Sequence, residues 1–264
     1  MSEALPILTA RNVNKRFGGV QALSGVSFSI RRGEIYGLIG PNGAGKTTLF
    51  NVLTGIYAPD TGEFVFDGAP LSELKPHEVA HRGIARTFQN IRLFANLSAL
   101  ENVMIGRHLR THAGVFGAIF HDARTLAEEK AITKRAYELL DYVGVSKRAN
   151  TLAKHLAYGD QRRLEIARAL ATEPKLLALD EPAAGMNATE TAALKTLLDH
   201  IRREGTTILL IEHDMRLVMS ICDRVLVLDY GRKIAEGPAA EVQRDPKVIA
   251  AYLGGEVALS RKRA

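Results

Sequence analysis

The sequence is poor in cysteine and contains no long apolar run. Its 264 residues include one cysteine, Cys222, so no disulfide can form within the chain and a reducing compartment is expected. No apolar stretch approaches the roughly 20 residues that a membrane-spanning helix needs. Residues 1–4 lack the basic and apolar regions of a signal peptide. We therefore expect a cytosolic chain whose association with a membrane comes through a partner.

The remaining composition is ordinary for a soluble globular protein. Hydrophobic residues make up 46% of the chain and charged residues 24%. A mass of 28.8 kDa allows one substantial core with room for a subdomain. The net charge of +6 comes from 35 Lys and Arg against 29 Asp and Glu. This excess of positive charge is compatible with an anionic ligand, a nucleic acid or the inner face of a membrane, and it does not discriminate among the three.

A glycine-rich segment carries the strongest local signal. It follows the pattern of Gly, four residues, then Gly-Lys-Ser/Thr, and it consists of Gly40, Pro41, Asn42, Gly43, Ala44, Gly45, Lys46, Thr47 and Thr48. An apolar strand is predicted before it, over 34–39, and a helix after it, over 49–54. Glycines let successive N–H groups turn toward an anion, and the helix dipole adds roughly 0.3 to 1 kcal/mol for negative charge. We predict a nucleoside triphosphate site in which Lys46 reaches the β and γ phosphates and the Thr47 hydroxyl binds Mg²⁺. The alternative is a glycine-rich turn without a ligand.

Two adjacent carboxylates form the second signal. Four apolar residues, 176–179, precede Asp180 and Glu181, so a buried strand is predicted to deliver both acids at its C-terminal edge. Open α/β sheets bind ligands at this edge. Asp180 matches the acid that holds Mg²⁺ in phosphate-loop ATPases, and Glu181 can polarise the water that attacks the γ-phosphate. The alternative is a helix cap or a surface turn.

Other segments outline an α/β chain with a helical insert. Residues 91–150 lose their β-branched runs and are rich in Ala, Leu, Glu, Lys and Arg, most clearly over 126–142, which indicates helices. A basic loop over 15–19 contains Phe17, and an apolar segment over 114–120 is too short to span a bilayer. Asn187 and Glu190 form a predicted capping box for a helix that ends near Arg203. Strands are predicted over 7–13, 26–30, 62–66, 207–211 and 224–228, and two short helices over 239–253.

A third motif resembles the signature of the ATP-binding cassette family. It follows Leu156, precedes a helix over 162–170, and consists of Ala157, Tyr158, Gly159, Asp160 and Gln161. The resemblance implies that two cassettes pair head to tail, so that the signature of one faces the γ-phosphate held by the loop of the other. The usual serine is Ala157 here and the first glycine is Tyr158. A hydroxyl contact is therefore lost, and the Gly159 backbone and the helix dipole remain.

The same resemblance implies roles for other residues. Phe17 would stack on adenine, Gln89 would sense Mg²⁺ and the attacking water, and His213 would contact the γ-phosphate. Residues 184–187 lie where the family has its dimer-crossing loop. The implied fold class is α/β: a phosphate-loop NTPase core with an N-terminal antiparallel β subdomain and an inserted α-helical subdomain. The chain is then a single domain over 1–264. Residues 1–90 and 160–255 form the core, 91–159 the helical subdomain with the signature, and 256–264 a basic tail.

Within the family, the chain looks most like the ATP-binding subunit of bacterial branched-chain amino-acid uptake systems. The shared features are the signature with the residues behind it and residues 111–128, 180–185, 211–215 and 248–254. Such systems pair two related ATP-binding chains with two transmembrane permease subunits and a periplasmic solute-binding protein. The resemblance therefore places this chain at the cytoplasmic side of the inner membrane, held by permease subunits, with ATP and Mg²⁺ as cofactors.

Other functions share the nucleotide motifs. Close relatives serve urea or other small polar solutes. A lipid, polysaccharide or lipopolysaccharide exporter ATPase is a further alternative, but the helical insert looks longer than such exporters need. A soluble ATPase clamp acting on nucleic acid or ribosomes has only the +6 charge in its favour. Those relatives usually carry two cassettes or a long insertion, so no nucleic-acid partner is expected.

Overall fold

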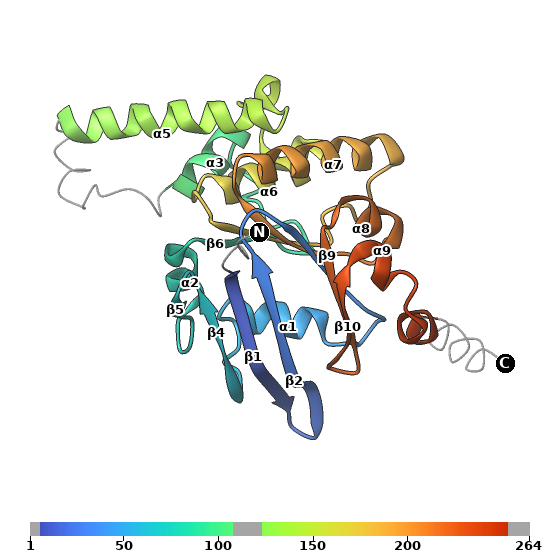
Figure 1. Cartoon of the computed structure of the whole chain (residues 1–264). Coiled ribbons are helices and arrows are strands. Elements are labelled where there is room, and N and C mark those ends of the chain that lie inside the picture. The colour runs from blue at the N-terminus through green and yellow to red at the C-terminus, as the bar shows by residue number, and fades with distance from the viewer. Residues whose placement is uncertain (1–5, 108–122, 253–264) are drawn as a thin grey trace.

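Two β-sheets face each other across one helix (Figure 1). The structure is a computed structural model and describes residues 6–107 and 123–252. The apolar segment over 114–120, most of the insert feature over 111–128 and the tail over 256–264 lie outside these residues.

The first sheet is antiparallel and has the strand order β2-β1-β4-β5. Its strands are β1 (Pro6–Phe17), β2 (Val20–Arg31), β4 (Thr61–Phe66) and β5 (Ala69–Pro70). The predicted basic loop over 15–19 is wrong in part. Residues 15–17 continue β1 and pair with β2, because a tight turn at Gly18 and Gly19 brings Phe17 opposite Val20. Cross-strand hydrogen bonds thus override the local polarity of Lys15 and Arg16.

The second sheet has the order β10-β9-β3-β8-β7-β6. Its parallel strands are β3 (Ile35–Ile39), β6 (Ile84–Arg86), β7 (Leu176–Asp180), β8 (Thr207–Ile211) and β9 (Arg224–Asp229), and β10 (Arg232–Pro238) runs antiparallel to β9. The predicted strands 34–39, 207–211 and 224–228 are confirmed, whereas β10 was not predicted. Three of the central strands are buried at every residue, as parallel strands covered on both faces should be.

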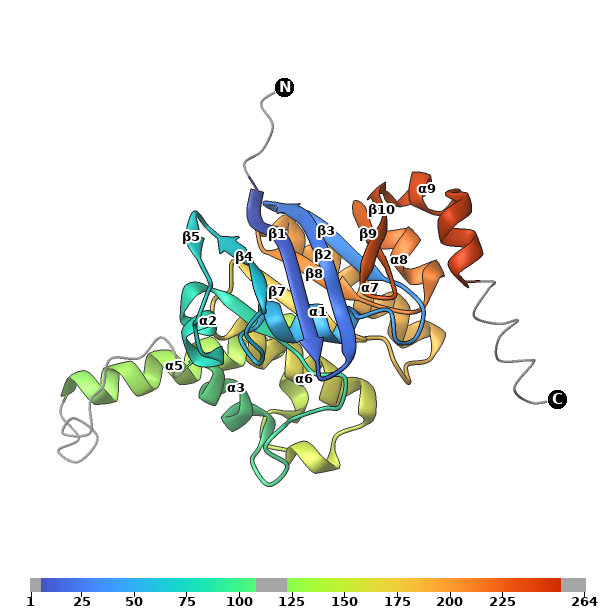
Figure 2. The same cartoon turned by 90° about the horizontal axis from the view of Figure 1, so that it is seen from below.

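Helix α1 (Lys46–Leu53) lies between the two sheets (Figure 2). Its Leu49, Phe50 and Leu53 pack in one core with apolar residues of β1, β2 and β4 and with one face of the second sheet. The helix begins at Lys46, three residues before the predicted start. Lys46 and Thr47 therefore belong to its first turn, where backbone N–H groups have no partner within the helix.

The opposite face of the second sheet is covered by helices. These are α6 (Tyr158–Leu170), α7 (Ala188–Arg203), α8 (Met215–Ile221), α9 (Ala239–Val242) and a helix over 246–252. The predicted capping box of α7 is confirmed, since the Asn187 side chain accepts from Glu190 N and the Glu190 carboxylate accepts from Asn187 N. Two short helices follow residue 238, as predicted.

The predicted helical insert is confirmed, and its own core contains α6. The insert holds α3 (Ala99–Arg107), α5 (Ala123–Tyr142) and the 3₁₀ turns η2 (Ser146–Arg148) and η3 (Ala153–His155). Helix α2 (Pro76–Arg82) precedes β6 outside this group. On α6, Leu164 and Ala167 pack with α3 and α5, whereas Ile166 and Ala169 pack under the second sheet. Helix α6 thus joins the two cores. The division of the chain near residues 91 and 159 stays a prediction.

Within residues 6–107 and 123–252, none of the helices combines the length and the apolar character that crossing a bilayer would require.

Candidate nucleotide site

The glycine-rich segment forms a tight loop between β3 and α1. Gly40 has φ +152°, and a Cβ built on it would lie 2.1 Å from the carbonyl oxygen of Leu228 on β9. Gly45 has φ +100° and also lies close to β2, since an added Cβ would be 2.7 Å from Ala22 O. Only glycine satisfies both conditions without displacing backbone. The loop is therefore held against two neighbouring strands before any ligand binds.

A cavity of about 400 Å³ opens over this loop. It is lined by Val20, Gln21, Ala22, Asn42, Gly43, Ala44, Gly45, Lys46, Thr47, Thr48, Gln89, Glu181 and Tyr230. Seven of the nine loop residues predicted to bind ATP line it, together with the predicted Gln89 and Glu181. The loop residues Gly40 and Pro41 are not among the lining residues; their carbonyl groups accept hydrogen bonds from Lys46 instead.

Lys46 is buried beneath the loop. Its ammonium group donates to Gly40 O at 2.6 Å and to Pro41 O at 3.0 Å. Burial lowers the pKa of Lys46, while the carboxylates of Glu181 and Asp180 raise it in part. The Lys46 ammonium thus interacts electrostatically with both predicted acids, an arrangement suited to bridging phosphates and a metal ion.

Asp180 ends strand β7 and is also buried. Burial raises the pKa of its carboxyl to about 6, and the guanidinium of Arg86 on β6 acts in the opposite direction. Among the described residues no cluster of His, Cys, Asp and Glu would hold a metal by itself. Asp180, the Thr47 hydroxyl and the Gln89 amide nevertheless offer the oxygen ligands that Mg²⁺ prefers, and phosphate oxygens of a nucleotide would complete the shell. The donor set therefore fits the predicted ion.

Glu181 lies between Gln89 and His213. Its Oε2 accepts from Gln89 Nε2 at 2.9 Å, and its Oε1 lies 3.7 Å from His213 Nδ1. The His213 side chain is exposed, and its Nδ1 is also 3.8 Å from the buried Glu212. The structure thus brings together three residues from distant segments that the sequence assigned to one reaction.

Phe17 stands beside the cavity but is not among its lining residues. Its half-exposed ring makes an edge contact with Tyr57 at 5.2 Å between centroids, and Lys15 Nζ lies 5.5 Å from its centroid. Its partner in the hairpin, Val20, does line the cavity. An aromatic face at this edge, with a cation beside it, suits a purine base.

The signature residues lie elsewhere. Ala157 is the N-cap of α6, Gly159 is buried, and none of residues 157–161 lines the cavity over the phosphate loop. Asp160 pairs weakly with Arg163 at 3.9 Å, and Gln161 Nε2 donates to Leu156 O. Tyr158 is 44% exposed. The signature therefore contributes no lining residue to the cavity over the phosphate loop of its own chain.

Several residues at the site have no motif that would have revealed them. Tyr230 lines the cavity; the residue is 85% exposed and has a left-handed φ of 43°. Glu212 is fully buried and accepts from Ala183 N and His213 N, which ties the segment after Glu181 to His213. The positions of Tyr230 and Glu212 depend on how the strands pair, and a local sequence pattern does not predict strand pairing.

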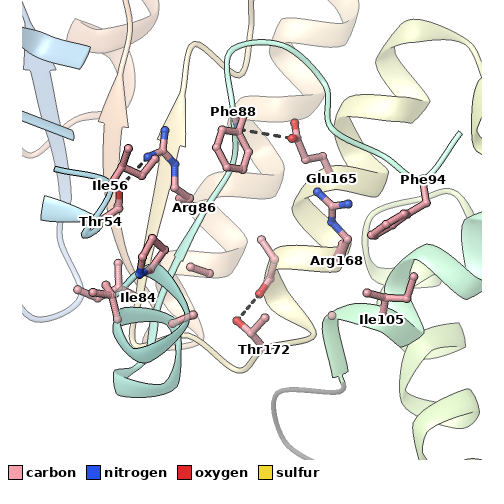
Figure 3. A pocket seen from close by; sticks show the side chains of 16 residues that line it. Thr54, Ile56, Ile84, Arg86, Phe88, Phe94, Ile105, Glu165, Arg168 and Thr172 are labelled. Carbon is pink, nitrogen blue, oxygen red and sulfur yellow. Dashed lines mark hydrogen bonds between the residues drawn. The ribbon is translucent and has the colours of Figure 1, made fainter. Parts of the chain in front are cut away.

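A second cavity, of about 460 Å³, lies between β6, α2, α3 and α6 (Figure 3). Ile56, Ile84, Phe94 and Ile105 give it an apolar lining, and Phe88, Glu165 and Arg168 lie along its α6 side. Phe94 is half exposed. Phe88 adjoins Gln89, so this cavity and the one over the phosphate loop share one connecting segment.

Comparisons with known proteins agree with these features. A family model described as "ABC transporter" matches residues 23–184, and one described as "Branched-chain amino acid ATP-binding cassette transporter" matches residues 232–258. The chain is 44% identical over 250 residues to the high-affinity branched-chain amino acid transport ATP-binding protein BraF of Pseudomonas aeruginosa, covering 94% of this chain and 98% of the relative. It is 43% identical to the high-affinity branched-chain amino acid transport ATP-binding protein LivG of Escherichia coli K12, again covering 94% of this chain and 98% of the relative.

Solved structures of similar sequence have the same fold. A cassette of an ABC transporter in its ADP conformation superposes with a TM-score of 0.83 at 34% identity, covering 95% of this chain and all of the other. A dimeric post-hydrolysis cassette bound to ADP and Pi gives a TM-score of 0.75 at 26% identity, covering 88% and 98%. The predicted fold class is confirmed by these matches and by the two sheets and helical insert described above.

Proposed function

The chain belongs to the ATP-binding cassette transporter family of ATPases, and from this premise we propose that it powers the import of branched-chain amino acids across a bacterial cytoplasmic membrane. One observation supports the catalytic part: the phosphate loop, Lys46, Gln89 and Glu181 border a single cavity. The solute is proposed from the 43–44% identical relatives, whose descriptions name branched-chain amino acid transport.

We assign the proposed chemistry to this chain's residues as follows. Backbone N–H groups of the loop and the Lys46 ammonium would bind the phosphates of ATP, with Phe17 against the base. Asp180, Thr47 and Gln89 would hold Mg²⁺, which when bound neutralises phosphate charge. Glu181 would accept the proton of the attacking water, and His213 would contact the γ-phosphate.

Two variants separate binding from hydrolysis in this proposal. Glu181→Gln keeps the size and the hydrogen bond to Gln89 but lacks the base, so ATP binding should be retained while turnover falls by about 100-fold or more. Lys46→Ala removes the buried cation and should weaken ATP binding itself. Binding is measured with a fluorescent ATP analogue and turnover by phosphate release. Normal turnover in Glu181→Gln would refute the role of Glu181.

We further propose that a segment of a transmembrane permease subunit docks in the second cavity, holding the chain at the cytoplasmic face of the membrane. The apolar lining around Phe94 and Ile105 suits an apolar helix, and the adjoining Phe88–Gln89 segment would transmit docking to Glu181. Phe94→Glu should prevent co-purification with the permease and leave ATP binding intact. Tyr137→Glu, an exposed aromatic on α5, is the matched control. Equal recovery of the permease with both variants would contradict docking at this cavity.

The solute is tested in cells. Deletion of this chain should abolish uptake of labelled leucine, isoleucine and valine, and Glu181→Gln should not restore it. The solute itself would be delivered by a periplasmic binding protein through the permease, so this chain need not contact it. Loss of urea uptake with normal leucine uptake would move the proposal to another importer. Co-purification with lipopolysaccharide-export subunits would replace import by export.

A further inference from the structure

Arg162 is a buried arginine one turn beyond the start of the signature helix. Its side chain is 3% exposed, and all five of its N–H donors have partners. The Tyr158 hydroxyl accepts from Nε at 3.2 Å and from Nη2 at 2.9 Å. Nη1 donates to Phe88 O at 2.9 Å and to Glu165 at 3.4 Å, and Nη2 also donates to Gln89 O.

The two carbonyl acceptors flank the Cα of Gln89. Phe88 O belongs to the peptide group before this Cα and Gln89 O to the peptide group after it. A planar guanidinium that holds both groups restricts φ and ψ of Gln89, and with them the direction of its side chain. That side chain donates to Glu181 Oε2 at 2.9 Å. A continuous path of hydrogen bonds therefore runs from Tyr158 through Arg162 and Gln89 to Glu181.

Glu165 completes this arrangement from the same helix. Its carboxylate is 2% exposed, pairs with Arg162, and accepts from Phe88 N and Arg92 N at 3.4 Å each. The bond from Phe88 is visible beside the second cavity (Figure 3). A buried ion pair adds little net stability compared with apolar residues, because both charges lose their hydration. Here Arg162 and Glu165 both hydrogen-bond to the backbone of the segment that carries Gln89. The pair therefore holds this segment in place.

We propose that Arg162 is a positioning residue for hydrolysis: it fixes Gln89 toward Glu181 and links both to the exposed Tyr158 of the signature. The inference rests on the proposed roles of Glu181 and Gln89. Since Tyr158 stands at the surface, contact of a second cassette with its ring would reach Gln89 through Arg162.

The test compares turnover and ATP affinity in the full chain for wild type, Arg162→Gln, Gln89→Ala and the double variant. Arg162→Gln should lower kcat by about 10- to 100-fold, the range expected for misplacement of a catalytic group, while the Kd for ATP changes less than about twofold. In the double variant, kcat should equal that of Gln89→Ala, because Arg162 acts only through Gln89. Full additivity of the two losses would overturn the proposal, as would unchanged kcat in Arg162→Gln.

Two controls exclude a merely structural effect. Arg163→Gln removes the next arginine of the helix, which lines a different cavity between α5 and α7, and should leave kcat unchanged. Arg162→Gln combined with Glu165→Gln removes the unpaired buried charge; it should restore thermal stability but not kcat.

Amide exchange at Phe88 and Arg92 should become faster in Arg162→Gln, and unchanged exchange would count against positioning. If Glu181→Gln hydrolyses ATP normally, the proposed function has failed; if only Arg162→Gln does, this inference alone has failed.

Discussion

Glu181 has a left-handed backbone, with φ 47°, at the position proposed for the catalytic base. Such a conformation in a residue with a Cβ costs on the order of 1 to 3 kcal/mol and persists where the surroundings impose it. The Glu181 N–H donates to Ile211 O on β8, which fixes the turn directly after β7. A glycine would relieve the strain but would bring no carboxylate to Gln89. The backbone strain at Glu181 is thus a consequence of placing a carboxylate at this position of the site.

Cys222 illustrates how burial controls a reactive group. The thiol is buried against Gly37 of β3, where an added Cβ would lie 3.0 Å from its Sγ. Burial raises the pKa of Cys222 far above its ordinary value, so the thiol stays protonated and unreactive at neutral pH. A thiol reagent at about pH 8 should react roughly 100-fold more slowly with the native chain than with the chain in denaturant. Absorbance at equal reagent concentration measures both rates, and rapid native labelling would contradict this burial.

At the scale of elements, one charged cluster joins the strands at the β10 edge of the second sheet. Arg224 of β9 pairs with Glu34 at 3.2 Å and with Glu236 of β10 at 2.7 Å, and Tyr36 of β3 donates to Glu236. Burial raises the pKa of Glu34, although Arg31 N–H and Arg224 oppose the shift. The folded chain therefore binds a proton at Glu34 more readily than the unfolded chain does.

This shift sets the sign of a pH effect on stability. The contribution of Glu34 is greatest when it is protonated and is lost as pH rises through its raised folded pKa. Glu34→Gln mimics the protonated form. Its free energy of unfolding, relative to wild type, should therefore increase from about pH 5 to about pH 8 in denaturant titrations. Glu63→Gln, which removes an exposed carboxylate of β4, should show a smaller change. A relative stability of Glu34→Gln that falls over this range would refute the assignment.

The helices around α6 show why one element can serve two regions. Leu164 and Ala167 face the helical insert, Ile166 and Ala169 face the second sheet, and Arg162 reaches the segment that carries Gln89. Helical periodicity places residues three and four apart on one face, so neighbouring residues serve different partners. Movement of α6 would accordingly be felt at both the insert and Gln89.

At the scale of the whole molecule, the signature does not reach the cavity of its own chain. If the phosphate loop of one chain works with the signature of another, two inactive variants should complement each other. Lys46→Ala removes the loop cation, and Gly159→Asp places a negative charge at the signature where phosphate is expected. Each alone should be nearly inactive, whereas an equal mixture should recover a measurable part of wild-type phosphate release. Absence of any recovery would indicate that the sites are not shared.

Much of this protein follows from the sequence itself. The turn geometry of residues 40–48 requires glycine, the apolar run before Asp180 requires a buried strand, and the Asn187 to Glu190 spacing requires a helix start. These are local constraints, imposed by backbone angles and by the period of apolar residues. They were sufficient to predict most elements of the core and the position of Asp180 and Glu181 at the end of β7, whereas the family came from the resemblance of the signature motif.

Only the tertiary structure decided which distant groups meet. Strand order in the second sheet places Leu228 against the phosphate loop, and the packing of the first sheet places Ala22 there. The fold also brings Tyr230 and Glu212 to the site. The hairpin drew residues 15–17 into β1 despite their charge. Arg162 looked like one more arginine of a polar helix, yet its burial and five hydrogen bonds come from packing α6 against the Gln89 segment. Such contacts join residues that are far apart in the sequence, so no local sequence pattern predicts them.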